Sequence, residues 1–266
     1  MITVSPRVLM YHGFCDRPRD HDPFSLFVTA DAFRHQLEYL LASGRRPLDL
    51  TAYLQTRQSG RSPVGSFLVT IDDGFCSVAD IAAPLLSSAG VPAVLFVPPA
   101  RIGGTSAWMP EMPDEPILTA DQLRGLAQHG IELGVHGLDH LDVVGLSDAE
   151  LHRHVVESRE LLSDLTGVRA RSFAYPRGRH DQRAAAAVRG AGYEVAFAVF
   201  SGRGPFAIPR IDITAVDSLT TVRLKLVPGY RQAWRMAGHF PAARRFARRA
   251  VAGRQRRRSS PTGTRS

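Results

Sequence analysis

The chain has 266 residues, of which 44% are hydrophobic and 22% charged, a composition that excludes disorder throughout and suits one large globular domain. Two cysteines are too few for a disulfide framework, and we find neither a run of about 18 apolar residues nor a secretory signal, so we expect reduced thiols and a cytoplasmic location. The net charge of +8 is unevenly distributed: residues 1–217 hold 20 basic and all 25 acidic side chains, whereas residues 218–266 hold 13 basic and no acidic ones.

Short apolar segments predict the strands of a parallel sheet. They are rich in Val, Ile, Leu and Phe and show little alternation with polar residues, which is typical of strands buried on both faces. In chain order the expected strands are Arg7–Tyr11, Phe67–Ile71, Ala93–Val97, Ile131–Val135, Arg171–Tyr175 and Glu194–Val199.

Amphipathic stretches between these strands predict helices. In Asp31–Ser43 apolar side chains recur on one face, and Gly44 follows as a stop signal. Two other stretches begin with a capping box, in which the first and fourth residues satisfy each other's free backbone donors: Thr119 with Gln122, and Ser147 with Glu150. The remaining expectations are a helix from Ser147 to near Gly167 and another over Asp181–Arg189.

The alternation of strand and helix over about 200 residues implies βα units, and therefore a barrel or an open doubly wound sheet. The segment Arg101–Pro116 contains two adjacent glycines and three prolines, which predicts a long irregular loop able to line a site.

Polar residues follow four of the predicted strands directly. In an α/β barrel the carboxyl ends of the strands form the active-site face, so four clusters at strand ends predict one shared site. The clusters are His12, Asp72-Asp73-Gly74, His136-Gly137-Leu138-Asp139-His140 and Pro176-Arg177-Gly178.

Two of these clusters have the residue types of a metal site. His136 and His140 are spaced so that both imidazoles can reach one cation, and one aspartate would complete three protein ligands with a position left for water, as in catalytic zinc sites. Simpler interpretations remain open: adjacent aspartates commonly cap a helix, and a pair of histidines at this spacing arises by chance. No Glu follows His136, so the pattern is not that of the HExxH zinc proteases.

The motifs together, in this order, resemble the polysaccharide deacetylase family, carbohydrate esterase family 4. The likeness rests on Thr70-Ile71-Asp72-Asp73-Gly74, on His136-x-x-x-His140 and on Phe173-Ala174-Tyr175-Pro176-Arg177-Gly178, and it extends from about Val8 to about Val227. The resemblance implies an α/β fold, a single-domain distorted (β/α) barrel. It also implies removal of N-acetyl groups from an amino-sugar-containing glycan or glycoconjugate with a divalent metal, usually Zn²⁺.

The resemblance also implies a role for each motif residue. Asp73, His136 and His140 match the metal ligands, and Asp72 matches the catalytic base. A metal lowers the pKa of bound water, and a nearby carboxylate can then remove its proton. Substrate binding is expected at the third motif, with the backbone N–H of Arg177 facing the oxyanion: Tyr175, Pro176, Arg177 and Gly178.

Three departures from the family pattern modify these expectations. Gly137 stands where Ser or Thr is usual, so one hydrogen bond is expected to be missing. Ala174 stands where many members have an arginine that pairs with the catalytic base, and Arg210 is the expected substitute. Arg177 replaces the usual aromatic residue, which removes the basis for sugar stacking there.

The family's usual C-terminal leucine–histidine motif has no convincing counterpart. Instead, the Tyr-His pair at the end of the first strand resembles an N-terminally permuted arrangement found in some relatives. His12 would then protonate the leaving amine.

We expect two regions: a catalytic domain over residues 1–227 and an Arg-rich basic tail over 228–266. Aromatic residues interleaved with arginines in the tail suit a peripheral contact with an anionic membrane surface. A solvated tail is the simpler alternative. Nucleic acid is disfavoured because no recognition pattern accompanies the arginines.

Other functions fit parts of the same sequence. A catalytically inactive carbohydrate-binding relative is disfavoured because both aspartates and both histidines are present. A metal hydrolase acting on another amide or ester keeps the same site. A phosphohydrolase would use His–Asp pairs such as His21-Asp22 or His180-Asp181, which here fall in predicted loops.

Overall fold

The computed structural model describes residues 6–59, 65–199, 202, 204–227 and 229–230. Contacts divide the chain into two compact units, Met1–Leu219 and Thr220–Ser266, and all the predicted site residues lie in the first. The expected basic tail lies outside the described residues, except for Gly229 and Tyr230. Among the residues described, no helix has the length and apolarity needed to cross a membrane.

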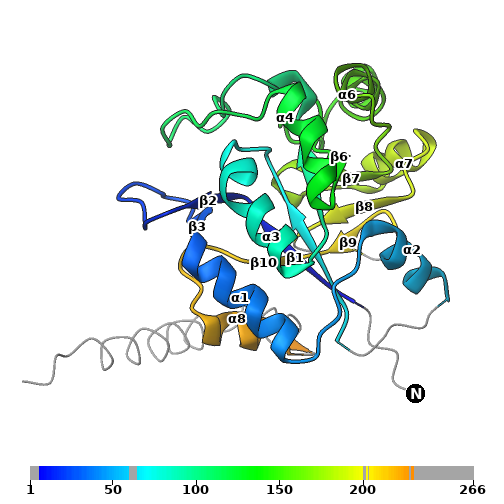
Figure 1. The fold of residues 1–266 in the computed structure, drawn as a ribbon. Helices are drawn as coiled ribbons and strands as arrows, with labels where there is room; N and C mark the ends of the chain where they lie inside the picture. The colour runs from blue at the N-terminus through cyan, green and yellow to red at the C-terminus, as the bar shows by residue number, and fades with distance from the viewer. Residues whose placement is uncertain (1–5, 60–64, 200–201, 203, 228, 231–266) are drawn as a thin grey trace, which may run out of the picture. The chain divides into compact units, whose positions relative to one another are not determined.

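Eight strands of the first unit form one parallel sheet that curves into a barrel (Figure 1). The four strands expected at β1, β4, β5 and β6 are confirmed with the same bounds, whereas β7 and β8 are shorter than expected. In sheet order the strands are β10 (Ile211–Asp212), β1 (Arg7–Tyr11), β4 (Phe67–Ile71), β5 (Ala93–Val97), β6 (Ile131–Val135), β7 (Ser172–Ala174), β8 (Val195–Ala198) and β9 (Ile208–Pro209).

One extended segment, residues 208–212, closes the barrel. Its first part, β9, pairs with β8, and its last part, β10, pairs with β1, so that a single residue, Arg210, separates the two pairings. The backbone N–H of Arg210 donates to the carbonyl of Ala198 at 3.0 Å. The sequence indicated a strand-like region before Arg210, but not two separate strands, because two-residue strands contain no apolar run. The sheet is therefore a nearly closed barrel rather than an open one.

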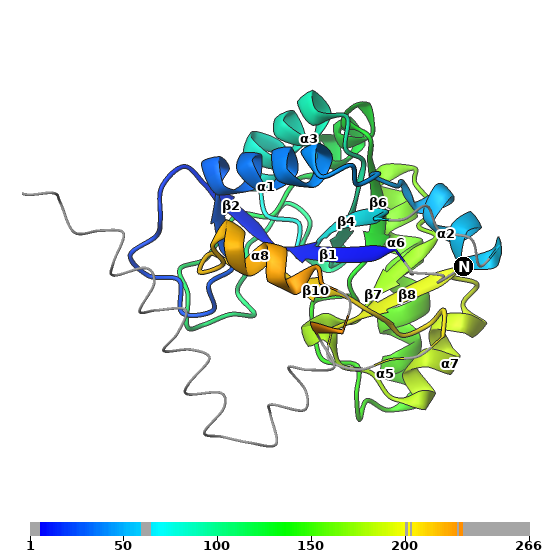
Figure 2. The same ribbon diagram turned by 90° about the horizontal axis from the view of Figure 1, so that it is seen from below.

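Apolar side chains fill the amino-terminal part of the barrel. Helix α2 (Leu50–Ser59) lies beside the amino end of β1 in Figure 2, and its Tyr53 packs against Phe197, with 6.0 Å between ring centroids. Phe96 packs against the same Phe197 at 5.5 Å. Most of this core comes from the inner face of the strands: Val8, Leu68, Val94, Phe96, Ala174, Val195, Phe197 and Ile208. The polar motif residues lie at the opposite, carboxyl end of the strands.

Helices surround the strands, as Figures 1 and 2 show. The capping boxes predicted at Thr119 and Ser147 are both present. A π-helical turn, η4 (Arg153–Glu157), joins α5 to α6 in one continuous helix. The other bounds are α1 (Ala30–Ala42), η1 (Val78–Ala82), α3 (Ala83–Ala89), η2 (Pro99–Arg101), α4 (Ala120–Gly125), η3 (Leu126–His129), α5 (Asp148–His152), α6 (Ser158–Thr166), η5 (Pro176–Gly178), α7 (Gln182–Gly190) and, at the start of the second unit, α8 (Leu219–Lys225).

Two loops at the carboxyl end extend the face of the barrel. A small parallel sheet pairs β2 (Gly13–Cys15) with β3 (Phe27–Thr29), and the residues between them form one loop. The other is the predicted irregular segment Arg101–Pro116, which contains no strand or regular helix beyond the last residue of η2, as expected.

Replacing Gly134 by alanine is expected to destabilise the barrel. A Cβ there would lie 2.4 Å from Cε1 of Phe96 and 2.9 Å from Oγ of Ser172, so the buried ring would have to move. Overpacking of this kind costs about 1–3 kcal/mol, measurable as a lower free energy of unfolding in urea. Gly125→Ala is the matched control, because nothing lies within 4 Å of its Cβ, and it should leave stability unchanged or raise it by up to about 1 kcal/mol. Equal stability of both variants would contradict this packing.

Candidate active site

The backbone carries the motif residues to the carboxyl ends of neighbouring strands. The backbone N–H of Asp72 donates to the carbonyl of Tyr11, and that of His136 donates to the carbonyl of Val97, both at 2.9 Å. The sheet's hydrogen bonding thus continues to the first residue beyond β4 and β6. Each motif therefore starts from a fixed point on the barrel rim.

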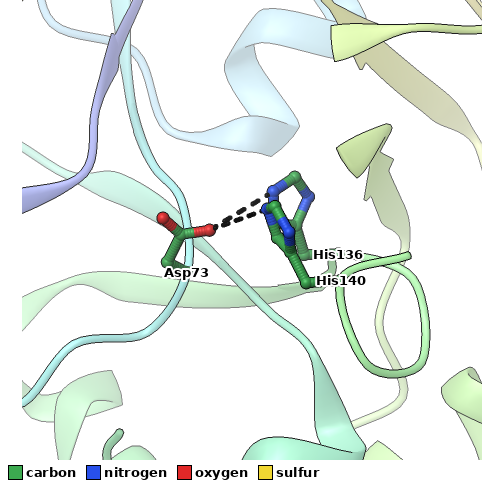
Figure 3. A group of neighbouring side chains, drawn as sticks. All are labelled: Asp73, His136 and His140. Atoms are coloured by element: carbon green, nitrogen blue, oxygen red, sulfur yellow. Dashed lines mark ion pairs between the residues drawn. The ribbon is translucent and has the colours of Figure 1, made fainter. Parts of the chain in front are cut away.

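Asp73, His136 and His140 converge on one point, although the two motifs are separated by more than sixty residues of sequence. Figure 3 shows the carboxylate of Asp73 facing both imidazoles. Its Oδ1 lies 3.6 Å from Nε2 of His136 and 3.2 Å from Nε2 of His140. The three ligand atoms lie within 4.8 Å of one another. The predicted grouping of these residues is present.

Two of these three residues adopt strained backbone conformations. Asp73 has φ +74° and His140 has φ +73°, in the left-handed region that side-chain-bearing residues rarely occupy. Such a conformation costs on the order of 1–3 kcal/mol and persists only where the surroundings enforce it. Local sequence preference therefore does not create this arrangement; the packing of the loops does.

The two histidines are oriented by different contacts. Nδ1 of His136 donates to the carbonyl of Ala174 at 2.8 Å, which leaves the lone pair of Nε2 directed to the site. Burial lowers the pKa of His136 to about 4, so its imidazole is neutral at pH 7. His140 instead stacks on the indole of Trp108, with centroids 4.9 Å apart and planes inclined by 22°.

The donor set fits a divalent cation. Oδ1 of Asp73 is buried and accepts no hydrogen bond, which is a costly state for a carboxylate oxygen unless a cation completes it. One carboxylate oxygen and two imidazole nitrogens are ligands that Zn²⁺ accepts, with a fourth position left open.

Asp72 lies beside this group but is engaged by a different partner. Both of its oxygens accept hydrogen bonds from the guanidinium of Arg210, each at 2.6 Å, and Arg210 also donates to Oγ1 of Thr70 at 3.3 Å. Burial by itself would raise the pKa of Asp72, but Arg210, with His136 and His12, more than offsets burial and holds that pKa below its usual range. The pairing expected between Arg210 and the carboxylate is therefore found.

His12 lies at the same face, immediately after β1. It is one of the neighbouring groups that lower the pKa of both Asp72 and Asp73. Its Nδ1 is buried and has no hydrogen-bond partner.

Three of the four residues of the third motif are buried. The Tyr175 side chain is fully buried, and its hydroxyl donates to the carbonyl of Phe206 at 2.8 Å, so this side chain supports the fold, and substrate binding at the motif stays a prediction. Pro176 and Gly178 are buried as well, and a Cβ at Gly178 would lie 2.3 Å from Val199. Arg177, with φ +58°, is the one exposed member of the four.

Sequence reasoning missed Trp108, which supplies one wall of the site. It sits in the segment Arg101–Pro116, where only the irregularity of the loop was predictable. The loop is anchored by a bidentate ion pair between its Glu115 and Arg19 of the β2–β3 loop. Trp108 packs on an apolar cluster that both loops share: Cys15, Phe27, Phe75, Met112 and Ile117.

The His–Asp pairs of the phosphohydrolase alternative have structural partners. His21 contacts the carbonyl of Glu111 at 2.9 Å, and Asp22 accepts hydrogen bonds from two backbone N–H groups. His180 stacks on Tyr175, and Asp181 caps α7. Neither pair reaches the candidate site, so the structure disfavours this alternative.

Comparison with known proteins agrees with this geometry. The family model for polysaccharide deacetylase matches residues 59–196. YxkH of Bacillus subtilis (strain 168), a protein assigned to the polysaccharide deacetylases, is 25% identical over 213 residues, which cover 78% of this chain and 71% of that protein.

Two solved structures share the fold. The Streptococcus pyogenes deacetylase PplD in complex with acetate has a TM-score of 0.72 at 21% identity, covering 85% of this chain and 99% of PplD. IcaB from Ammonifex degensii has a TM-score of 0.70 at 23% identity, covering 84% and 97%. Because the family model spans more than half of the sequence and includes the Asp-Asp and His-x-x-x-His motifs, the chain belongs to the polysaccharide deacetylase family.

Proposed function

We propose that this protein is a metal-dependent deacetylase that removes N-acetyl groups from an amino-sugar-containing glycan or glycoconjugate. One observation carries the proposal: a buried Asp–His–His group lies beside a second carboxylate that an arginine keeps ionised. Metal-assisted amide hydrolysis needs a site for a cation and a separate base, and this combination of residues supplies both. The acetate bound to PplD is what deacetylation would release, which supports the acetyl group as the part removed.

Each residue has a distinct task in this proposal. Asp73, His136 and His140 hold the cation, proposed to be Zn²⁺, which when bound acts as a Lewis acid. Asp72 accepts the proton of the attacking water at its carboxylate, and Arg210 keeps that carboxylate ionised and fixes its plane. The backbone N–H of Arg177 donates to the developing oxyanion.

The amine that leaves must be protonated, because an amide anion is far too basic to depart. His12 is the proposed donor: it lies at the same face, and a histidine can be charged before this step and neutral after it.

Two further expectations stay predictions. We propose that residues 1–227 form the catalytic region and that the basic segment 228–266 contacts an anionic membrane surface from a cytoplasmic location. The support is the charge distribution: residues 218–266 carry +13, with 11 of these basic residues in 228–266, whereas residues 1–217 carry −5.

Single substitutions should distinguish the residues that bind the metal from the catalytic base. Asp73→Asn, His136→Ala and His140→Ala are each expected to lose bound metal and turnover, because a three-residue site tolerates no missing ligand. Asp72→Asn is the control and should keep stoichiometric metal while losing turnover. Elemental analysis and acetate release from N-acetylated glycans measure both quantities. Near-normal turnover of metal-loaded Asp72→Asn would show that Asp72 is not the catalytic base.

Loss of Arg210 should move the pH profile. Without the guanidinium, burial raises the pKa of Asp72, so its carboxylate becomes ionised only at higher pH. The acid limb of kcat/KM in Arg210→Gln is expected to move up by about 1–3 pH units, and Arg210→Lys, which keeps the charge, should move it less. Arg34→Gln, at an exposed arginine of α1, is the control. An unmoved acid limb in folded Arg210→Gln would separate Asp72 from the base role.

His12→Ala should retain metal and a normal melting curve but lose about two or more orders of magnitude in turnover of an amide substrate, the scale of general-acid catalysis. The loss should shrink for an activated aryl acetate, whose leaving group departs without a proton. Equal losses on both substrates, or loss of metal, would remove His12 from the acid role.

A further inference from the structure

The loop that carries two of the proposed ligands has little side-chain support of its own. Between His136 and His140 the chain passes through Gly137, at φ +69°, before reaching the strained φ of His140. A Cβ at Gly137 would lie 3.0 Å from Cγ of Pro176 and 3.6 Å from Nδ1 of His154. A side chain at this position is therefore disfavoured by the backbone and by the close approach of Pro176, and His154 packs beside the same glycine.

His154 contacts the loop through both of its ring nitrogens. Its Nδ1 accepts a hydrogen bond from the backbone N–H of Leu138 at 3.3 Å. Its Nε2 lies 3.8 Å from Oδ1 of Asp139, and the same Oδ1 accepts the N–H of Leu141 at 3.2 Å. Because a backbone N–H can only donate, Nδ1 is the acceptor, and the ring proton is on Nε2, facing Asp139. One imidazole thus spans the residues that immediately precede His140.

A local irregularity of the helix coincides with this position. His154 is the second residue of the π-helical turn η4, and such turns are rare and frequently occur at functional sites. Its neighbours His152 and Arg153 are exposed, whereas His154 is only 5% exposed. The hydroxyl of Ser158 donates to the carbonyl of His154 at 2.7 Å, which fixes the backbone there.

We propose that His154 is a positioning residue for the metal centre, which holds the His136–His140 loop in the conformation that directs His140 at Asp73. The proposal rests on the proposed function, because it assigns His154 to the cation site formed by Asp73, His136 and His140. It adds a residue 14 positions beyond the last ligand, on a different element and outside every motif of the sequence.

The test removes the hydrogen-bond acceptor of His154 and keeps the shape of the side chain. His154→Phe retains a planar ring without an acceptor, and His154→Asn retains an acceptor near the position of Nδ1. Contacts that orient a ligand are worth about 10- to 100-fold in metal affinity, so the Kd for Zn²⁺ of His154→Phe should rise by about that factor, and His154→Asn should recover most of the loss. His152→Phe, at an exposed histidine of the same helix, is the matched control and should bind as the wild type does.

Two further measurements distinguish positioning from a general loss of stability. The visible spectrum of the Co²⁺-loaded protein reports ligand geometry, and it should change in His154→Phe but not in His152→Phe. Amide hydrogen exchange of the wild type needs no variant, and the N–H of Leu138 should be protected. If His154→Phe fails to fold, two results still test the proposal. The N–H of Leu138 should be protected from exchange in the wild type, and the Kd of His154→Asn should lie within several-fold of the wild-type value.

The outcomes separate the two proposals. A wild-type protein that binds neither Zn²⁺ nor Co²⁺ would overturn the proposed metal centre itself. A wild type that binds Zn²⁺ tightly, with a folded His154→Phe of equal Kd and spectrum, would overturn only the role of His154. Equal weakening in His154→Phe and His154→Asn, or rapid exchange at Leu138, would also overturn it, because the hydrogen bond would then not be the cause.

Discussion

The buried ion pair between Arg210 and Asp72 is the interaction on which the barrel and its active face jointly depend. A carboxylate removed from water is costly unless a partner satisfies both of its oxygens, and the guanidinium does so with two hydrogen bonds of 2.6 Å. Arg210 is also the residue between β9 and β10, where one segment pairs with β8 on one side and β1 on the other. The residue that completes the barrel thus also keeps the proposed base ionised.

Around that pair, the face is built from short loops whose conformations only packing can maintain. Asp73, His140 and Arg177 all have positive φ, so three residues of the site are strained at the backbone. Contacts from segments distant in the chain support these conformations: the carbonyl of Ala174 on His136, the ring of Trp108 on His140 and the imidazole of His154 on Leu138. In the proposed metal centre, contacts of this kind would place the three ligands before a cation binds, which reduces the cost of organising them.

Many strands and helix caps were predictable from the sequence, because the patterns that specify them involve neighbouring residues. Buried strands such as Phe67–Ile71 are continuous apolar runs, and capping boxes such as Ser147 with Glu150 satisfy their own backbone donors, so neighbouring residues are enough to specify them. The hydrogen bond of Tyr175 was not predictable, because a tyrosine at a strand end looks the same in sequence whether its hydroxyl meets substrate or, as here, the carbonyl of Phe206. Trp108 gave no signal, because its partner His140 lies in a different loop.

The sequence by itself determined the alternation of strands and helices, the order of the motifs and the residue types at each strand end. Those features depend on periodicity and on neighbours in the chain, and the strand-end rule then gathers Asp73, His136 and His140 at one face. Only the tertiary structure decided which residues complete that face. Arg210 reaches Asp72 across 138 positions, and His154 reaches Leu138 through a π-helical turn. Contacts between segments distant in sequence depend on barrel closure and loop packing, which no local pattern encodes.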